Sequence, residues 1–342
     1  MHDLPPSHPA QPWRIGVDVG GTFTDLVLHD AAGLLFVAKV PSTPEDPAKG
    51  VIAAVERLAG DHGLDATAVL AGCDLFVHGS TVATNTMLEG KGAKVGMITT
   101  KGFRDSLEIR RGMREDMWDH RTPFAPVLVP RFLRIGVDGR LDRDGVELTA
   151  LDTGAVADAA ALFRENGVES VAVCLLNSFL DPVHERQAGE ALSQVFDPHN
   201  ISLSTTIAPI MGEYERGSTA VVNAYLAPRV VPYLQRLDES LRDMGLRHPM
   251  LLVQSNGGAA SVAQVAARPV NLALSGPASA VGALNLVAEQ TGHDDLISME
   301  IGGTSCDVVM MHKGDVALAD DLMIAGYHVG TPAIDVHTVG AG

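Results

Sequence analysis

The stretch DVGGTFTDLVL at residues 18–28 is nearly repeated as EIGGTSCDVVM at residues 300–310. The copies share an acid, two glycines, a threonine and a later aspartate: Asp18, Gly20, Gly21, Thr22 and Asp25 in the first, Glu300, Gly302, Gly303, Thr304 and Asp307 in the second. In each copy an apolar run enters the turn and another leaves it, which is typical of a β-hairpin. The repeat therefore predicts two related units, one at each end of the chain.

Each turn has the residues that a phosphate site needs. Glycines permit unusual backbone angles and let backbone N–H groups approach an anion, and threonine adds a hydroxyl donor. The preceding acid would repel phosphate, but it can hold Mg²⁺ and so bridge to phosphate. A single copy would more often be a purely local hairpin feature, whereas two copies that share the acid favour twin lobes facing one nucleotide.

Composition excludes several classes of function. The 342 residues carry a formal charge of -17, which disfavours nucleic acid and anionic membranes as partners. No basic segment followed by an apolar run opens the chain, and no run of about 18 apolar residues occurs, so neither export nor a membrane span is expected. The three cysteines, Cys73, Cys174 and Cys306, form no CxxC pair, which fits a reducing cytoplasm.

The alternation of apolar strands and amphipathic helices predicts an α/β protein whose sheets are covered by helices. We expect a flexible tail at 1–13 and a first lobe at 14–200, with an irregular insertion at about 103–148 that contains short strands and a DRDG turn. The second lobe is expected at 201–342, with its own meander at the end.

Two details of the second lobe are also predicted. Separate helices are expected at about 213–227 and 231–244. The segment DVALAD at 315–320 is expected to supply the third strand of the second meander.

The repeated turns resemble the two phosphate-binding turns of the actin-like ATPase superfamily, and the chain more closely resembles its hydantoinase A/5-oxoprolinase family. Six blocks carry this resemblance: VDVGGTFTDLVL at 17–28, HGSTVATNTMLEGKGAKVGMITTKGFRD at 78–105, EYERGSTAVVNAYLAP at 213–228, QSNGG at 254–258, SGPASAVGAL at 275–284 and EIGGTSCDV at 300–308. The resemblance implies an actin-like ATPase (ribonuclease H-like) fold with duplicated lobes. Members of the family are longer, so the second lobe is expected to be incomplete.

By the same resemblance, the chain is expected to use ATP with Mg²⁺ or Mn²⁺ to activate a small cyclic amide, such as a hydantoin or a 5-oxoproline-like lactam, for ring opening. A ketone for carboxylation is the alternative substrate, and a hydantoinase B-type partner subunit and an oligomer are implied. Two rivals stay open at this point, a small-molecule kinase of the same superfamily and a non-catalytic remnant.

The resemblance also gives the candidate site residues. Asp18 and Glu300 are expected to hold the metal and, with His78, to serve catalysis. Residues expected to contact the nucleotide are Gly20, Gly21, Thr22, Thr24, Asp25, Gly302, Gly303, Thr304, Ser275 and Gly276. The family has aspartate where this chain has Glu300, whose extra methylene moves the carboxylate by roughly one bond length.

Three other features have competing interpretations. His78 and the hydroxyl residues after it could form an anion site at a helix start, or Ser80 or Thr81 could simply cap the helix over a buried histidine. Ser275 and Gly276 precede a helix and could contact phosphate or only allow close packing. The run RRGMRED at 110–116 is most often a solvated loop, although an arginine there could grip a substrate carbonyl if the run lay in a cleft.

Overall fold

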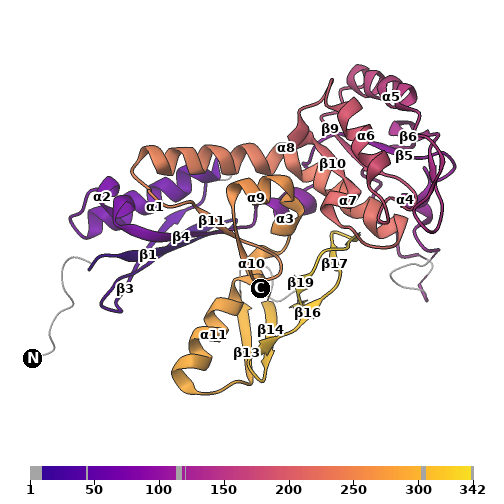
Figure 1. The fold of residues 1–342 in the computed structure, drawn as a ribbon. Coiled ribbons are helices and arrows are strands. Elements are labelled where there is room, and N and C mark those ends of the chain that lie inside the picture. Colours follow the sequence, from indigo (N-terminus) through magenta and orange to yellow (C-terminus); the bar gives the residue numbers. More distant parts are fainter. Residues whose placement is uncertain (1–9, 44, 113–117, 120, 302–305, 340–342) are drawn as a thin grey trace, which may run out of the picture.

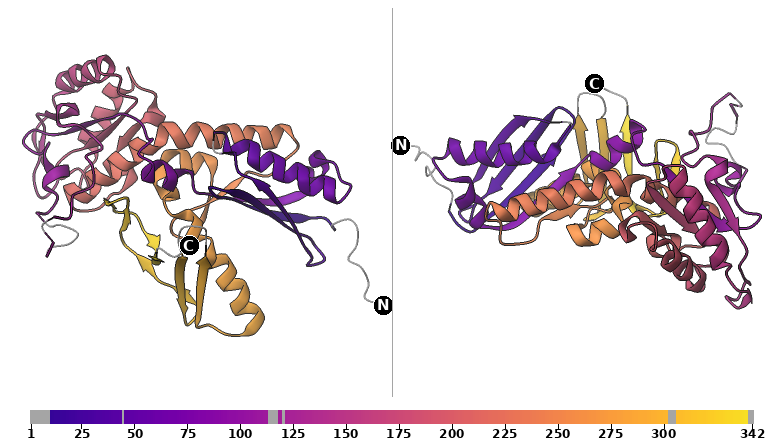
Figure 2. Two further views of the ribbon diagram at one scale, coloured as in Figure 1. Left: turned by 180° about the vertical axis from the view of Figure 1, so that it is seen from behind. Right: turned by 90° about the horizontal axis from the view of Figure 1, so that it is seen from above.

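The computed structural model describes residues 10–43, 45–112, 118–119, 121–301 and 306–339 (Figure 1). It contains a six-stranded sheet, two four-stranded sheets and a long helix that runs across the six-stranded sheet and one of the four-stranded sheets. The last part of the chain forms the other four-stranded sheet, which projects from the middle of the molecule in Figure 1 and Figure 2, on the side of the long helix that faces the first two sheets.

Six strands form the sheet that carries the first turn, in the order β12-β11-β4-β1-β2-β3. Their bounds are β1 (Trp13–Val19), β2 (Phe23–His29), β3 (Leu35–Pro41), β4 (Cys73–Ser80), β11 (Leu251–Val253) and β12 (Ala259–Ser261). The first three strands form the predicted antiparallel meander, while β4 runs parallel to β1 and β11 parallel to β4. Buried and exposed residues alternate along β1, and α1 (Pro47–Asp61) packs on the apolar face. This alternation places Asp18 on the face opposite α1.

Four parallel strands form the second sheet, in the order β10-β9-β5-β6. They are β5 (Val95–Thr100), β6 (Arg134–Val137), β9 (Ser170–Cys174) and β10 (Ile201–Leu203), with α5 (Thr153–Glu165) and α6 (Val183–Leu192) packed on them. All residues of β5 and β9 are buried, and most of them are apolar. Such continuous apolar strands are typical of a parallel sheet covered on both faces.

The predicted insertion is only partly irregular. Its segment FLRIGV contributes β6, which pairs with β5 and so belongs to the second sheet. The DRDG turn is confirmed, because it joins β7 (Arg140–Leu141) to β8 (Glu147–Thr149) and the backbone N–H of Asp142 donates to Val146 O at 2.9 Å.

One continuous helix, α8 (Glu213–Asp243), replaces the two helices predicted between 213 and 244. Pro228 and Pro232 lie inside it without ending it. Pro228 has no N–H for the carbonyl of Ala224 four residues earlier, but the Ser170 hydroxyl donates to that carbonyl at 2.6 Å. Tertiary structure thus supplies the hydrogen bond that the proline removes, and the helix continues.

The last part of the chain forms the third sheet from β13 (Leu296–Ile301), β14 (Cys306–His312), β15 (Asp315–Val316) and β20 (Val336–Val339). The predicted third strand at 315–320 is wrong for most of its length. Only β15 pairs with β14, and β16 (Leu318–Ala319) pairs instead with β19 (Ala333–Ile334). The strand beside the turn end of β14 is β20. Helix α11 (Ala280–Thr291) covers one face of this sheet.

Shorter elements connect these units. They are α2 (Ala66–Ala71), α3 (Val82–Leu88), α4 (Ser106–Ile109), η1 (Arg131–Leu133), η2 (Pro198–Asn200), α7 (Ser204–Ile207), α9 (Val262–Ala267), η3 (Pro269–Leu272), α10 (Ser275–Ala278), β17 (Leu322–Ile324) and β18 (Tyr327–Val329). The predicted division of the chain near residue 200 stays a prediction. Two strands from beyond it, β11 and β12, belong to the first sheet.

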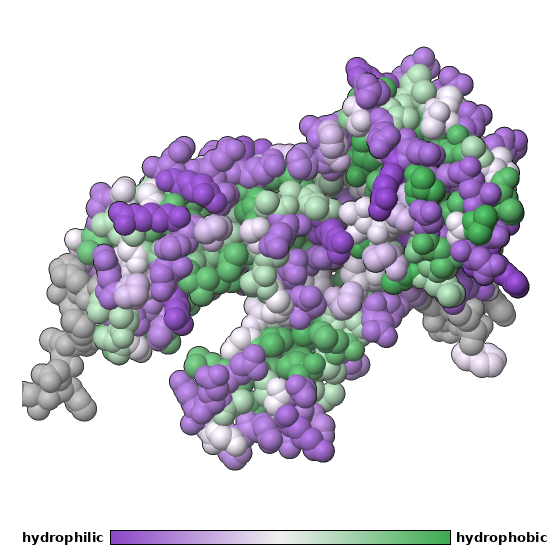
Figure 3. All heavy atoms as spheres, in the orientation of Figure 1, coloured by the Kyte–Doolittle hydropathy of each residue, from purple (hydrophilic) through white to green (hydrophobic). Residues whose placement is uncertain are grey.

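Polar side chains cover most of the face drawn in Figure 3. Apolar residues gather on the upper part of the unit that contains β13, β14 and α11. The face of β13 that α11 does not cover is apolar and exposed at Ile297, Met299 and Ile301. Within the described ranges, no helix combines the length and apolar character needed to cross a bilayer.

Candidate functional site

The two repeated segments form hairpins with the same register. Asp18 pairs with Asp25 across β1 and β2, and Glu300 pairs with Asp307 across β13 and β14. In each hairpin the acid before the glycines therefore lies beside the later aspartate on one face of the ribbon. The alignment predicted from the sequence is confirmed in three dimensions.

The first turn is held by hydrogen bonds to its own backbone. The N–H of Gly20 donates to Phe23 O at 3.0 Å, and the Ser42 hydroxyl donates to Gly20 O at 2.7 Å. Neither Gly20 nor Gly21 uses a positive φ. A Cβ placed on Gly21 would meet no described atom within 4 Å. This glycine therefore leaves an open approach to the turn rather than relieving backbone strain.

Asp18 lies in a row of four residues across the first sheet. Its neighbours on the same face are Gly79 of β4 on one side and Asp25, then Lys39, on the other. Lys39 forms an ion pair with Asp25 at 2.8 Å. The loss of solvation raises the pKa of Asp18, the charge of Asp25 raises it further, and Lys39 opposes both. Gly79 leaves room for the carboxylate, since a Cβ there would lie 3.2 Å from Asp18 Oδ1.

Glu300 belongs to the same electrostatic cluster. Partial burial raises its pKa to about 7, and the charges of Asp307 and Asp18 add to the effect. Asp18 therefore lies within electrostatic reach of Glu300, although the two residues come from opposite ends of the chain. The charge of Asp18 therefore acts on Glu300, and the binding of a metal ion by these two acids stays a prediction.

These two acids fit a divalent metal ion. Two carboxylates that repel each other favour a cation, and Mg²⁺ is commonly held by one or two carboxylates together with phosphate oxygens and water. Across the described ranges, no three metal-binding side chains form a cluster. A metal at this place would therefore depend on Asp18, Glu300 and the oxygens of the nucleotide.

The carboxyl ends of β1 and β4 meet the start of α10 at the same edge of the sheet. The Thr81 hydroxyl donates to Val19 O at 2.9 Å, and the Ser275 hydroxyl donates to Ser80 O at 3.0 Å. Ligands of open α/β sheets usually bind outside the carboxyl ends of parallel strands. Ser275 and Gly276 thus lie at this edge, but the Ser275 hydroxyl is already bound to protein, and their contact with a nucleotide stays a prediction.

Two predicted site residues lie on the other face of the sheet. His78 is fully buried, and its Nε2 lies 2.8 Å from the Tyr233 hydroxyl of α8. Burial lowers the pKa of His78 to about 4. Thr24 is also fully buried, 3.4 Å from the Ser42 hydroxyl between their oxygens. The structure does not bring either residue to the face that carries Asp18, so their predicted roles stay predictions.

The remaining predicted contacts divide into two groups. Thr22 is exposed in the first turn beside the two glycines. Gly302, Gly303 and Thr304 of the second turn lie outside the described residues. We did not predict Gly79 or Lys39 from the sequence. Both lie level with Asp18 across the sheet, Gly79 in β4 next to β1 and Lys39 in β3 next to β2.

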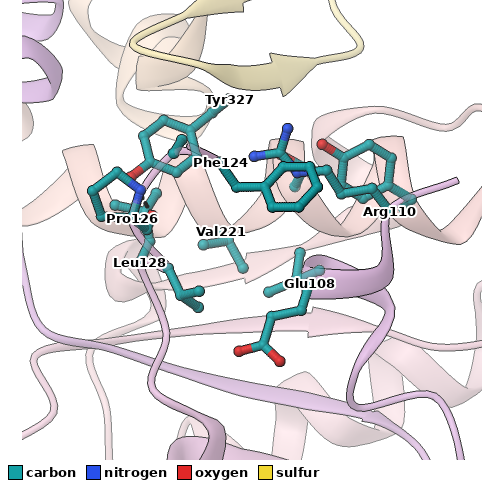
Figure 4. A pocket seen from close by; sticks show the side chains of 12 residues that line it. Glu108, Arg110, Phe124, Pro126, Leu128, Val221 and Tyr327 are labelled. Carbon is teal, nitrogen blue, oxygen red and sulfur yellow. Dashed lines mark hydrogen bonds between the residues drawn. The ribbon is translucent and has the colours of Figure 1, made fainter. Parts of the chain in front are cut away.

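The run at 110–116 contributes to a separate cavity of about 230 Å³, drawn in Figure 4. The Arg110 guanidinium carbon lies 4.9 Å from the centre of the Phe124 ring, and the Tyr327 hydroxyl donates to Pro126 O at 2.5 Å. Leu128 and Val221 supply apolar wall. Arg110 therefore lines a cleft, which is the condition under which an arginine of this run could grip a substrate carbonyl. Arg111 forms an ion pair with Glu215, and Arg114 lies outside the described residues.

Comparison with known families decides the assignment. The family model described as the hydantoinase/oxoprolinase N-terminal region matches residues 14–196, and the model described as hydantoinase/oxoprolinase matches residues 216–342. The chain belongs to the hydantoinase/oxoprolinase family.

Two sequence relatives of this hydantoinase/oxoprolinase chain indicate the range of reactions in the family. It is 39% identical to the caprolactamase subunit alpha of Pseudomonas jessenii, over 97% of this chain and 48% of the relative. It is 28% identical to the 5-oxoprolinase of Saccharomyces cerevisiae, over 96% of this chain and 28% of that protein. The chain thus spans about half, or less, of the length of these relatives.

Solved structures show the same fold. The crystal structure of the ATP-dependent caprolactamase from Pseudomonas jessenii matches with a TM-score of 0.88 and 40% identity, covering 96% of this chain and 48% of that one. A nucleotide-free acetone carboxylase structure matches with a TM-score of 0.87 and 26% identity, covering 97% and 48%. The predicted α/β fold class of actin-like ATPase type is confirmed.

Proposed function

We propose that this chain is the nucleotide-binding part of an ATP-dependent hydrolase that opens a cyclic amide by phosphoryl activation of its carbonyl oxygen. The observation that carries the proposal is the approach of Asp18 and Glu300 from two hairpins of equal register. The similarity to a caprolactamase subunit favours an amide substrate over a ketone.

The residues of the first turn would bind and orient the nucleotide. The open approach at Gly21 and the exposed Thr22 would receive phosphate oxygens, and Asp18 and Glu300 would hold Mg²⁺ or Mn²⁺. A bound metal ion of this kind would neutralise phosphate charge. Gly79 would keep the Asp18 carboxylate in place by leaving it space.

The proposed reaction balances as follows in atoms and charge. The amide oxygen attacks the γ-phosphorus of ATP, and ADP leaves with the bond electrons. Water then adds to the activated carbon, the C–N bond breaks to free the amine, and an acyl phosphate remains. A second water releases inorganic phosphate and leaves the carboxylate. The protein contributes by positioning the amide oxygen in line with the phosphate.

The test is ATP-dependent turnover in the natural assembly. The full polypeptide, purified with the subunits that accompany it, should release phosphate when ε-caprolactam, 2-pyrrolidone, 5-oxoproline or hydantoin is added, with one ring opened for each ADP formed. Phosphate release that requires bicarbonate and a ketone would favour the carboxylase alternative. A stable phosphorylated product would favour a kinase, and no stimulated release with any of these compounds would contradict the proposal.

The proposal includes a partner subunit, an oligomeric assembly and a cytoplasmic location. The matched caprolactamase chain is named as a subunit, which supports a hydantoinase B-type partner and an oligomeric assembly here. The three cysteines of the chain are free and buried, which supports work in a reducing cytoplasm.

A further inference from the structure

A large cavity of about 650 Å³ lies beyond the carboxyl end of β11 in the first sheet. Three parts of the chain enclose it, namely the loop after α7, the segment from β11 to η3, and residues 330–332 after β18. Part of the wall is apolar and belongs to Ile207, Ala208, Pro209, Ile210, Ala259, Ala260, Ala267 and Pro332. The space suits a small ligand with a hydrocarbon body.

Among the described residues that line the cavity, Arg268 alone carries a charge, and the other polar groups are neutral. Gln254 and Asn271 are half-buried carboxamides, and neither side chain hydrogen-bonds to another residue in the part of the chain that the structure describes. They are neighbours, because the N–H of Ser255 donates to Asn271 O at 2.7 Å. Thr331 is only 5% exposed, and its buried hydroxyl likewise has no partner among the described residues. Buried polar groups normally have partners, so the Thr331 hydroxyl is available to a ligand. The two carboxamides are only half-buried, so a ligand would replace water at them.

The cavity lies at the same edge of the sheet as the first turn. Gln254 follows β11, which runs parallel to β4, and β4 runs parallel to β1. Neighbouring strands lie about 4.8 Å apart, so the carboxyl end of β11 lies about 10 Å from that of β1. The chain from Asn271 also continues directly into Ser275 and α10 at this edge. A ligand here could therefore reach a phosphate held at the first turn.

We propose that this cavity binds the cyclic amide, with the carboxamides of Gln254 and Asn271 hydrogen-bonding to its N–H and C=O. The assignment rests on the proposed function. A small ring forces its amide into the cis form, which presents one donor and one acceptor side by side. A carboxamide offers the complementary acceptor and donor, so it can pair with a cis amide through two hydrogen bonds. The apolar wall then receives the ring methylenes, and a ketone, which has no N–H, loses half of this recognition.

The direct test compares ε-caprolactam with N-methyl-ε-caprolactam, which keeps the ring and carbonyl but has no N–H. Binding is measured by ligand-observed NMR on the full polypeptide with its accompanying subunits, without turnover. We expect the unmethylated lactam to bind about tenfold or more tightly, since a buried acceptor would otherwise be left unpaired. Equal affinity for the two lactams would overturn the assignment.

Gln254→Glu and Asn271→Asp test the residues with little change in size. Each replaces the N–H donor by an oxygen that repels the lactam carbonyl, so the KM for lactam should rise about tenfold or more while the KM for ATP stays the same. Gln264→Glu is the matched control, because it adds the same charge to the same cavity. The Gln264 side chain is already used in a capping box with Ser261, and glutamate also suits that position. Equal effects of all three substitutions would indicate general charge repulsion and overturn the assignment.

These measurements distinguish a failure of the cavity assignment from a failure of the proposed function. If the assembly hydrolyses lactams and neither substitution changes the lactam KM, the cavity assignment is wrong and the function stands. If the assembly hydrolyses no lactam, yet binds ε-caprolactam in a way that Gln254→Glu abolishes, the cavity assignment survives the failure of the function.

Discussion

Asp18 lies close enough to Glu300 for its charge to raise the pKa of that carboxyl group. The two residues occupy equivalent positions in hairpins from opposite ends of the chain. Like charges that approach each other do not stabilise a protein, and among the described residues neither carboxylate forms an ion pair like that between Lys39 and Asp25. The arrangement supports the proposed metal ion between the two carboxylates.

Asp18→Asn should lower activity without lowering stability. The substitution removes a charge that we propose to bind the metal ion, so kcat/KM should fall about 30- to 1,000-fold, which corresponds to roughly 2 to 4 kcal/mol. It also removes repulsion from Asp25 and Glu300, so the Tm of the nucleotide-free protein should stay the same or rise. Steady-state kinetics and differential scanning fluorimetry check the two effects. A parallel loss of Tm and activity would indicate that Asp18 is structural.

Glu300→Asp should be tolerated. Aspartate keeps the charge and shortens the side chain by about 1.5 Å, and the equivalent first turn already uses aspartate. We expect kcat/KM within about tenfold of the wild type, whereas Glu300→Gln should reduce it as Asp18→Asn does. If the aspartate variant loses all activity with an unchanged circular dichroism spectrum, the longer side chain has a role beyond holding charge.

Gly79→Ala should disturb the site through Asp18. The new Cβ would lie 3.2 Å from Asp18 Oδ1, so the carboxylate must shift by a few tenths of an ångström. Small displacements of this kind can reduce turnover about tenfold or more. Gly16→Ala is the control on the same face, because a Cβ there meets no described atom within 4 Å. Equal kcat values for the two variants would show that the space at Gly79 does not matter.

The hairpins were predictable because their information is local. Strand, glycine turn and returning strand are contiguous, and the register of the pairing follows from the short turn. The face that His78 occupies was also available in the sequence. Alternation along β4 places it with the buried Phe76 and opposite Gly79, but the hydroxyl residues that follow favoured a site near the helix start.

Other features depend on contacts between distant segments. The length of α8 could not be predicted, because proline usually interrupts a helix. The donor that compensates for Pro228 is Ser170, which lies 54 positions before Ala224, whose carbonyl accepts the hydrogen bond. The large cavity likewise joins Gln254, Asn271 and Thr331 from separate segments. No local pattern marks such residues, since their shared property is only the space that the fold leaves between them.

His78→Gln should change how stability depends on pH. The pKa of His78 is about 4 in the folded protein and 6.5 ordinarily, so between these values the unfolded chain binds the proton more readily. Stability from this group is complete above pH 6.5 and is lost as the pH falls towards 4. Between pH 7 and pH 5, urea unfolding should show a loss about 2 kcal/mol larger for the wild type than for the variant, which keeps a hydrogen bond to Tyr233. Equal losses would mean that His78 is not held neutral.

The last prediction concerns Pro228 in α8. The Ser170 hydroxyl donates to the Ala224 carbonyl that Pro228 leaves without an intrahelical donor. Ser170→Ala should therefore leave a buried carbonyl unpaired and lower the free energy of unfolding by about 1 to 3 kcal/mol. Ser193→Ala is the control, because its hydroxyl also donates to a carbonyl, that of Glu190, but on the exposed surface. This control should cost less than about 0.5 kcal/mol.

A double-mutant cycle tests whether the proline is the reason. Pro228→Ala restores an N–H to the helix, so the Ala224 carbonyl regains an intrahelical donor and no longer depends on Ser170. Ser170→Ala should then cost at least about 1 kcal/mol less in the Pro228→Ala background than in the wild type, as measured by urea unfolding. If the cost is the same in both backgrounds, the serine stabilises the fold in some other way, and the continuity of α8 through its prolines needs another explanation.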